Sequence, residues 1–143
     1  MKVLVAGGSG LIGAHVVDVL RERGHTVTTM ARAHADHVID LGQATDVQLR
    51  GMLAGQEAVV YAARTDEQRP MPKPVYPAFR AAMVDPVTRL FAAAREEGLV
   101  SGVLMGSYYT YFDRVHPEWR LTDRHVYVRC RVEQAREARA TGL

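Results

Sequence analysis

Residues 2–13 read Lys-Val-Leu-Val-Ala-Gly-Gly-Ser-Gly-Leu-Ile-Gly. The run from Lys2 to Ala6 has the length and apolar character of a buried parallel β-strand. Residues 11–23 follow with apolar side chains at helical spacing, at Ile12, Val16, Val19 and Leu20. Gly24 then supplies a stop signal for the helix. A strand, a glycine-rich turn and an amphipathic helix in this order predict the first unit of an α/β fold.

The same alternation of elements continues along the chain. We expect further strands at 26–30, 37–40, 58–62 and 100–105, and helices at 47–53 and about 78–97, the second of them bent at Pro86. Residues 107–122 are aromatic and polar without a clear period, and Asp123 is expected to cap a final helix that runs to about Ala140. This order predicts a doubly wound parallel sheet of the Rossmann type with about five strands, in a single domain over residues 1–143.

The segment from Arg64 to Pro77 is rich in proline, with Pro70, Pro72, Pro74 and Pro77. Proline lacks the backbone donor that helices and central strands need, so this segment is predicted to be a surface loop without a helix. Its cations Arg64, Arg69 and Lys73 are candidates for contact with an anionic substrate, with plain exposed charge as the alternative.

Composition excludes several classes of function. The 143 residues carry a formal charge of only +2, which argues against nucleic acid or an anionic membrane as a partner. No apolar run approaches the ~18 residues of a membrane span. The single cysteine, Cys130, permits no internal disulfide, and the six histidines show no metal-binding spacing, so no metal site is expected. The default expectation is a cytoplasmic protein.

The glycines of the turn follow a GxxGxxG pattern formed by Gly7, Gly10 and Gly13. In a dinucleotide-binding turn the first glycine permits the tight bend, the second lets the backbone approach a pyrophosphate, and the third lets the helix pack closely. The unpaired N–H groups at the start of the helix, at Leu11 and Ile12, then face the phosphates. A strand before and an amphipathic helix after the turn favour this interpretation over a plain glycine-rich loop.

Arg32 stands nineteen residues after Gly13, where an NAD-preferring domain carries an acidic residue for the ribose 2′-hydroxyl. An arginine suits a 2′-phosphate, which favours NADP over NAD. A solvated arginine at a strand end is the alternative.

The chain resembles the first half of the extended and atypical short-chain dehydrogenase/reductases, the NAD-dependent epimerase/dehydratase family. Besides the glycine turn, Asp40-Leu41 is similar to the family's acidic site that contacts the adenine, and residues 59–63, which end in Ala62-Ala63, resemble the strand that lines the cofactor. Residues 84–99 resemble the family's central helix. The resemblance implies a chain truncated relative to the family, without the C-terminal part that determines the substrate.

The resemblance also implies a catalytic set of Ser107, Tyr127 and Arg131. In it Tyr127 exchanges a proton with the substrate oxygen, and Ser107 donates a hydrogen bond to that oxygen. Free tyrosine has a pKa of about 10, so a base of this kind needs a nearby cation. Arg131 replaces the family's lysine, and Met83 falls at the position of its asparagine. A tyrosine on a helix face and a serine in a turn are the alternatives.

These observations predict an NAD(P)-dependent oxidoreductase, epimerase or dehydratase acting on a small carbonyl or alcohol substrate. The alternative is a non-catalytic dinucleotide-binding module, such as a redox sensor or the subunit of an assembly. Because a sheet that stops after its fifth strand leaves an unpaired edge, we also expect a homo-oligomer.

Overall fold

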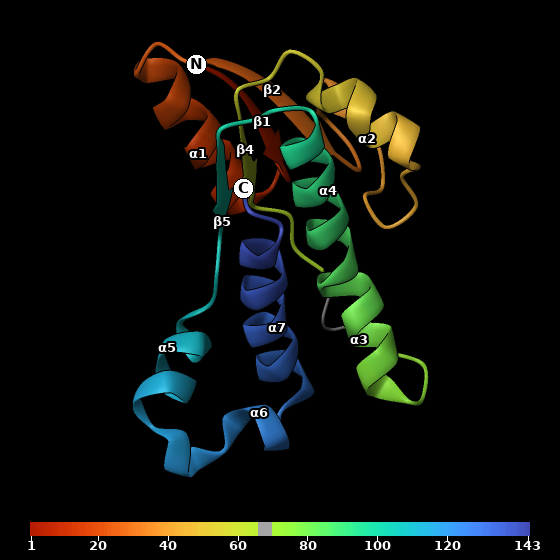
Figure 1. Ribbon diagram of the computed structural model, residues 1–143, viewed down its shortest axis with the longest axis vertical. Helices are drawn as coiled ribbons and strands as arrows, with labels where there is room; N and C mark the ends of the chain where they lie inside the picture. The colour runs from red at the N-terminus through yellow and green to blue at the C-terminus, as the bar shows by residue number, and fades with distance from the viewer. Residues whose placement is uncertain (66–69) are drawn as a thin grey trace.

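The computed structural model describes residues 1–65 and 70–143 and contains one parallel sheet of five strands (Figure 1). The strand order is β3-β2-β1-β4-β5, and all four pairings are parallel. The strands are β1 (Lys2–Ala6), β2 (Thr26–Ala31), β3 (His37–Val38), β4 (Ala58–Tyr61) and β5 (Ser101–Leu104). The predicted Rossmann-type sheet is therefore confirmed, with each strand within a few residues of its expected position.

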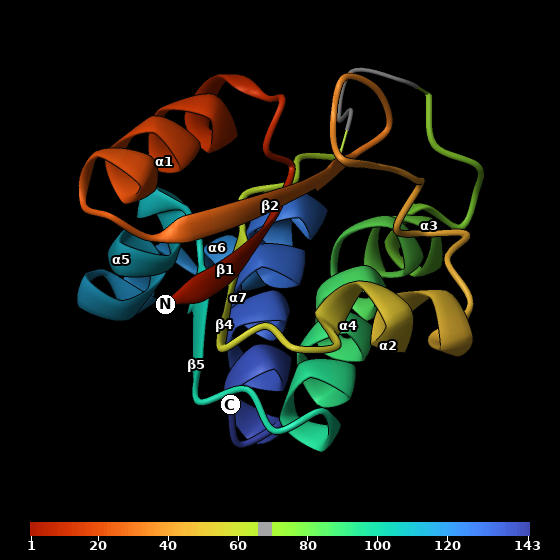
Figure 2. The ribbon, with the colours of Figure 1, turned by 90° about the horizontal axis from the view of Figure 1, so that it is seen from above.

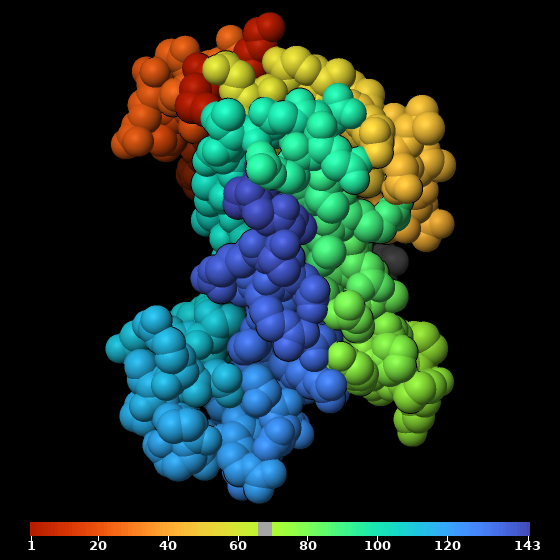
Figure 3. Space-filling view, viewed as in Figure 1, coloured from red at the N-terminus to blue at the C-terminus, as the bar shows by residue number. Residues whose placement is uncertain are grey.

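Helices cover both faces of this sheet, with α1 on one side and α2, α4 and α7 on the other (Figure 2). The helices are α1 (Leu11–Glu22), α2 (Asp46–Leu53), α3 (Val75–Met83), α4 (Asp85–Glu96), α5 (Tyr108–Val115), α6 (Leu121–Arg124) and α7 (Val126–Ala140), with a 3₁₀ turn at Pro117–Trp119. In the space-filling view, α3 and the α5–α6 segment project on either side of the first half of α7 (Figure 3). None of the helices in the described ranges is long and apolar enough to cross a membrane.

Two hydrophobic clusters hold the sheet between its helices. The larger one packs Leu4 and Val59 of the sheet against Leu90 and Phe91 of α4. The smaller one lies under α1, where Val17 contacts the other face of the central strands. Each fully buried side chain of this kind stabilises the fold by roughly 1.5–3 kcal/mol, so these clusters fix the position of the strand ends.

The buried stripe of α1 differs from the predicted one. Val17 is 5% exposed, whereas Ile12 is 52% exposed and Val19 is 44% exposed. The apolar spacing identified the helix correctly, but α1 lies on the outside of the smaller cluster and presents just a narrow stripe to it. The exposed Ile12 lies at the first turn of α1, next to the glycines.

The prediction that no helix forms before Pro77 is wrong, because α3 begins at Val75 with Pro77 in its first turn. Proline is tolerated there, since the N–H groups of a first helical turn have no intrahelical partner in any case. The expected helix over 78–97 is two helices that meet at Val84, with Pro86 in the first turn of α4.

The start of the last helix also differs from the prediction. Asp123 lies inside the short helix α6, and His125 is the residue that precedes α7. The aromatic segment after β5, which showed no clear period, forms α5. Ser107 occupies the N-cap of α5, a position that serine favours because its oxygen can accept a backbone N–H.

Candidate cofactor and active site

All the predicted cofactor residues follow the carboxyl ends of strands, which meet at one edge of a parallel sheet. The turn 7–13 follows β1, and Arg32 follows β2. Asp40 and Leu41 come after β3, and Ala62 and Ala63 after β4. Ligands of open α/β sheets bind outside this edge, so the topology brings residues from four strands to one binding surface.

The turn after β1 requires glycine at its two ends. Gly7 has a φ of 85°, in the left-handed region, and its N–H donates to the Met30 carbonyl at 2.7 Å. A Cβ at Gly7 would stand 2.5 Å from the backbone nitrogen of Ala63. A Cβ at Gly13 would stand 2.0 Å from the carbonyl oxygen of Gly7. The backbones of β1, β4 and α1 therefore pack against one another with no room for a side chain.

Gly10 and the start of α1 face a more open space. The nearest atom to a Cβ at Gly10 would be the Gly7 oxygen, at 3.3 Å, a tight contact but a much milder one than those at Gly7 and Gly13. Gly10 is the N-cap of α1 and supplies no side-chain acceptor. Among the described residues, no hydrogen-bond partner accepts from the N–H groups of Leu11, Ile12 and Gly13. A phosphate group fits this cradle, because it satisfies free N–H groups and the positive end of the helix dipole.

Arg32 lies beside this turn because the next residue, Ala33, is hydrogen-bonded to the turn. The Ser9 hydroxyl donates to the Ala33 carbonyl at 2.8 Å, which ties the glycine turn to the segment after β2. Arg32 is itself part of that segment. Asp40 is exposed, and one of its oxygens accepts from the N–H of Gly42 at 2.9 Å. Its second carboxylate oxygen and the Arg32 guanidinium leave charged groups at the same edge of the sheet as the turn.

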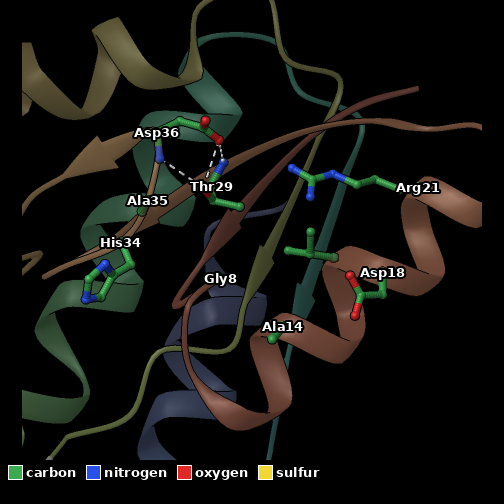
Figure 4. Close-up of a pocket in the computed structure, with 9 residues that line it drawn as sticks. Gly8, Ala14, Asp18, Arg21, Thr29, His34, Ala35 and Asp36 are labelled. Carbon is green, nitrogen blue, oxygen red and sulfur yellow. Dashed lines mark hydrogen bonds between the residues drawn. The ribbon is translucent and has the colours of Figure 1, made fainter.

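A groove of about 360 Å³ runs between α1 and the segment after β2, on the α1 side of the turn (Figure 4). Within it, Asp36 accepts hydrogen bonds from the N–H and the hydroxyl of Thr29, each at 2.8 Å. These bonds hold the pKa of Asp36 below its usual value, and the Arg21 guanidinium lowers it further. Asp36 therefore holds the segment that carries Arg32 against β2. No sequence pattern predicted this contact between Asp36 and Thr29, which lie seven residues apart.

Ser107 and Tyr127 lie on the two segments that follow β5. The Ser107 hydroxyl oxygen accepts from the N–H of Tyr109 at 3.4 Å, as the cap of α5. The Tyr127 ring meets the Tyr109 ring edge to face, with 6.0 Å between centroids. No hydrogen bond joins Ser107 to Tyr127 within the described ranges. Tyr109 thus contacts both candidate catalytic residues, Ser107 through its backbone N–H and Tyr127 through its ring.

Arg131 binds the backbone after β5. Its Nη2 donates to the carbonyls of Met105, at 3.3 Å, and Gly106, at 2.9 Å, while its Nη1 donates to Oε1 of Gln134 at 2.7 Å. Its Cζ lies 5.8 Å from the centroid of the Tyr127 ring, so the expected cation does stand near the tyrosine. Gln134 was not predicted as a site residue from the sequence. Its position three residues after Arg131 and seven after Tyr127, which places all three on one helix face, could have indicated it.

Tyr61 is a second residue that the sequence did not single out. It is the last residue of β4 and is 4% exposed. Burial raises the pKa of Tyr61 to about 12, since a phenolate is poorly solvated there; the Arg131 charge opposes this shift and the Asp40 carboxylate adds to it. Tyr61 is therefore a neutral hydroxyl between the predicted adenine-side and catalytic residues.

Among the described residues, the remaining ones singled out in the sequence add no further group to the candidate site. Met83 is buried, and its carbonyl accepts from Nε2 of Gln134 at 2.7 Å. Arg69 of the proline-rich segment lies outside the described residues. Across residues 1–65 and 70–143, no three His, Cys, Asp or Glu side chains gather as metal ligands would.

The sheet order, the glycine turn and the strand-end residues define a Rossmann-type dinucleotide-binding fold. The sequence pattern of the NAD dependent epimerase/dehydratase family matches residues 3–132, and the chain belongs to this family.

Several known proteins are similar to this chain. A 2-alkyl-3-oxoalkanoate reductase of Stenotrophomonas maltophilia is 40% identical over 62 residues, which are 43% of this chain and 18% of that protein. The structure of a short-chain dehydrogenase/reductase superfamily protein from Agrobacterium tumefaciens, with bound NAD, matches 98% of this chain and 44% of its own at 20% identity and a TM-score of 0.75. UDP-N-acetylglucosamine 4-epimerase from Bacillus cereus matches 100% of this chain and 50% of its own, at 21% identity and a TM-score of 0.72. The chain thus spans half or less of these relatives.

Proposed function

We propose that residues 1–143 form one dinucleotide-binding domain of an NAD(P)-dependent oxidoreductase, epimerase or dehydratase that acts on a carbonyl or alcohol substrate. The observation that carries this proposal is the turn from Gly7 to Gly13, where glycine is sterically required at both ends and the start of α1 has no cap of its own. Membership in an NAD-dependent family supports a nicotinamide dinucleotide as the group bound there.

In this proposal the free N–H groups at Leu11, Ile12 and Gly13 hold the pyrophosphate. Ala62 and Ala63 lie against Gly7 and flank the cofactor without filling its space. When bound, the nicotinamide ring accepts or donates a hydride.

The preference between cofactors is assigned to the residues beside the turn. Arg32 is exposed, and its side chain makes no hydrogen bond or ion pair with the described residues, so its guanidinium can bind a ribose 2′-phosphate, which favours NADP. Asp40 and Leu41 are assigned to the adenine end, where Leu41 packs against the larger core cluster.

The chemical step is assigned to Ser107, Tyr127 and Arg131. Ser107 donates a hydrogen bond to the substrate oxygen, and Tyr127 gives that oxygen a proton or removes one. Arg131 keeps a positive charge near Tyr127, with its Cζ 5.8 Å from the centroid of the Tyr127 ring. Among the described residues, the Ser107 hydroxyl oxygen is bound only through the weak 3.4 Å contact from Tyr109, so it can reorient toward a substrate.

The cofactor part of the proposal is tested by calorimetry with NADPH and NADH. Gly10→Val fills the space that a pyrophosphate needs, and its Cβ would meet the Gly7 oxygen at 3.3 Å, so it should abolish cofactor binding at a smaller cost to the fold than a side chain at Gly7 or Gly13. Unchanged affinity in a folded Gly10→Val variant would place the cofactor elsewhere.

The catalytic part is tested by turnover on a panel of carbonyl and alcohol substrates. Tyr127→Phe removes only a hydroxyl, so it should abolish turnover and leave cofactor affinity nearly intact. Tyr111→Phe is a matched control, since Tyr111 is 54% exposed on α5. A parent that binds cofactor but turns over no substrate would instead favour a non-catalytic dinucleotide-binding module. That alternative gains support from Arg131, because its guanidinium is bound to backbone carbonyls.

We also propose that the chain self-associates through the edge of its sheet. Within the described ranges the edge strand β5 pairs only with β4, and its Val103 is 47% exposed on the α1 side. An unpaired edge with an exposed apolar side chain is a surface that proteins usually cover.

A further inference from the structure

We propose that Gln134 is a positioning residue for the candidate active site. It holds the Arg131 guanidinium, which in turn holds the Gly106 carbonyl, and these contacts fix the separation between Ser107 and Tyr127. This inference rests on the proposed function, because it assigns a role toward the same site.

Gln134 is bound at both ends of its amide and is only 2% exposed. Its Nε2 donates to the Met83 carbonyl at the end of α3, and its Oε1 accepts from Nη1 of Arg131, both at 2.7 Å. A buried amide with both ends satisfied has one preferred orientation, because turning it over would oppose donor to donor at one end and acceptor to acceptor at the other. Gln134 therefore presents a fixed acceptor to Arg131.

Arg131 extends this chain to the end of β5. With Nη1 on Gln134, the planar guanidinium directs Nη2 at the carbonyls of Met105 and Gly106. Its Nε is buried and unpartnered among the described residues, so the hydrogen bonds that orient the group all come from its two Nη atoms. Loss of the Gln134 acceptor would leave the guanidinium held by Nη2 alone, so it could pivot about that atom.

The two candidate catalytic residues lie at the two ends of the hydrogen bond between Arg131 and Gly106. Ser107 directly follows Gly106, whose carbonyl receives the 2.9 Å hydrogen bond. Tyr127 lies four residues before Arg131 on α7, on the same helix face. The separation between them is therefore set by the Gln134–Arg131–Gly106 contacts, in addition to the Tyr109 ring.

A second polar contact joins the same two helices and provides the matched control. The hydroxyl of Tyr76 on α3 donates to both oxygens of Glu133 on α7, at 2.9 Å each. Glu133 also accepts from Nε of Arg129 at 3.0 Å, one turn away on its own helix. Tyr76→Phe thus removes an α3–α7 hydrogen bond without touching Arg131 or the backbone after β5.

The experiment compares Gln134→Met, Gln134→Glu and Tyr76→Phe in the full chain. Gln134→Met keeps the volume and removes both hydrogen bonds, so we expect the amide resonances of Gly106 and Ser107 to shift and kcat to fall by about tenfold to ~100-fold, with KM nearly unchanged. Gln134→Glu keeps the acceptor for Arg131 but sets a carboxylate oxygen against the Met83 carbonyl, so it should restore part of the lost kcat. Tyr76→Phe should lower the unfolding temperature and leave both readouts close to the parent.

Two results would overturn the inference. One is a Gln134→Met variant whose Gly106 and Ser107 resonances move no more than those of Tyr76→Phe. The other is an equal loss of kcat in Gln134→Met and Gln134→Glu. If the parent has no turnover, the proposed function fails, and the resonances of Gly106 and Ser107 alone decide whether Gln134 holds this backbone. If Gln134→Met does not fold, Gln134→Glu against Arg131→Lys decides. The three donors of a lysine lie on one nitrogen and do not reproduce the spacing of the two Nη atoms that bind Gln134 and the carbonyls, so only Arg131→Lys should shift the resonances.

Discussion

Gly13 is the position where a single added methyl group should disturb the turn most. A Cβ there would stand 2.0 Å from the Gly7 oxygen and 2.7 Å from the Gly7 carbonyl carbon, so helix α1 and the turn must separate by about 1 Å. Overpacking of this kind costs roughly 1–3 kcal/mol or more, and the better helix propensity of alanine returns at most ~1 kcal/mol. We expect Gly13→Ala to lower the free energy of unfolding by about 2 kcal/mol or more.

Thermal unfolding followed by circular dichroism measures this loss. For a domain of this size about 2 kcal/mol corresponds to a drop of roughly 6 °C in Tm. Gly51 is the matched control, because it lies exposed in α2, where an added methyl group would meet no atom within 4 Å. Gly51→Ala should therefore raise Tm by a few degrees, through a gain of roughly 0.5–1 kcal/mol. Equal Tm changes in the two variants, or a rise in Gly13→Ala, would refute the packing argument.

Three further predictions concern the cofactor, pH and assembly. Arg32→Asp should move the ratio of the NADPH and NADH dissociation constants toward NADH, and an unchanged ratio in calorimetry would remove Arg32 from the site. Because hydrogen bonds from Thr29 lower the pKa of Asp36 in the folded protein, their stabilisation is present above pH 3.8 and is lost as pH falls through the depressed pKa. Asp36→Asn should thus lower Tm at pH 7, by an amount that shrinks below pH 3.8; a constant difference over this range would contradict the linkage. Light scattering at about tens of micromolar should show self-association that Val103→Lys weakens, whereas a monodisperse parent monomer would count against the edge contact.

The sequence determined the order of the strands and the glycine turn, because both depend on local chemistry. An apolar run, glycines at Gly7, Gly10 and Gly13, and an amphipathic segment permit few backbone paths, and the chain follows the expected one. The strand-end position of Arg32 and Asp40 followed from the same reasoning, since parallel strands end at one edge. Residues close in sequence were sufficient for each of these inferences.

The tertiary structure alone decided which groups a side chain contacts. The spacing on α7 predicted Tyr127 and Arg131 on one face, but not that the guanidinium binds the Gly106 carbonyl and Gln134. Likewise, no local pattern indicated that Asp36 would accept from Thr29. Such contacts depend on distances between separate elements, which packing sets after the elements form. A long, charged side chain has several possible partners within reach of its stem, and burial of the surrounding helices selects one of them.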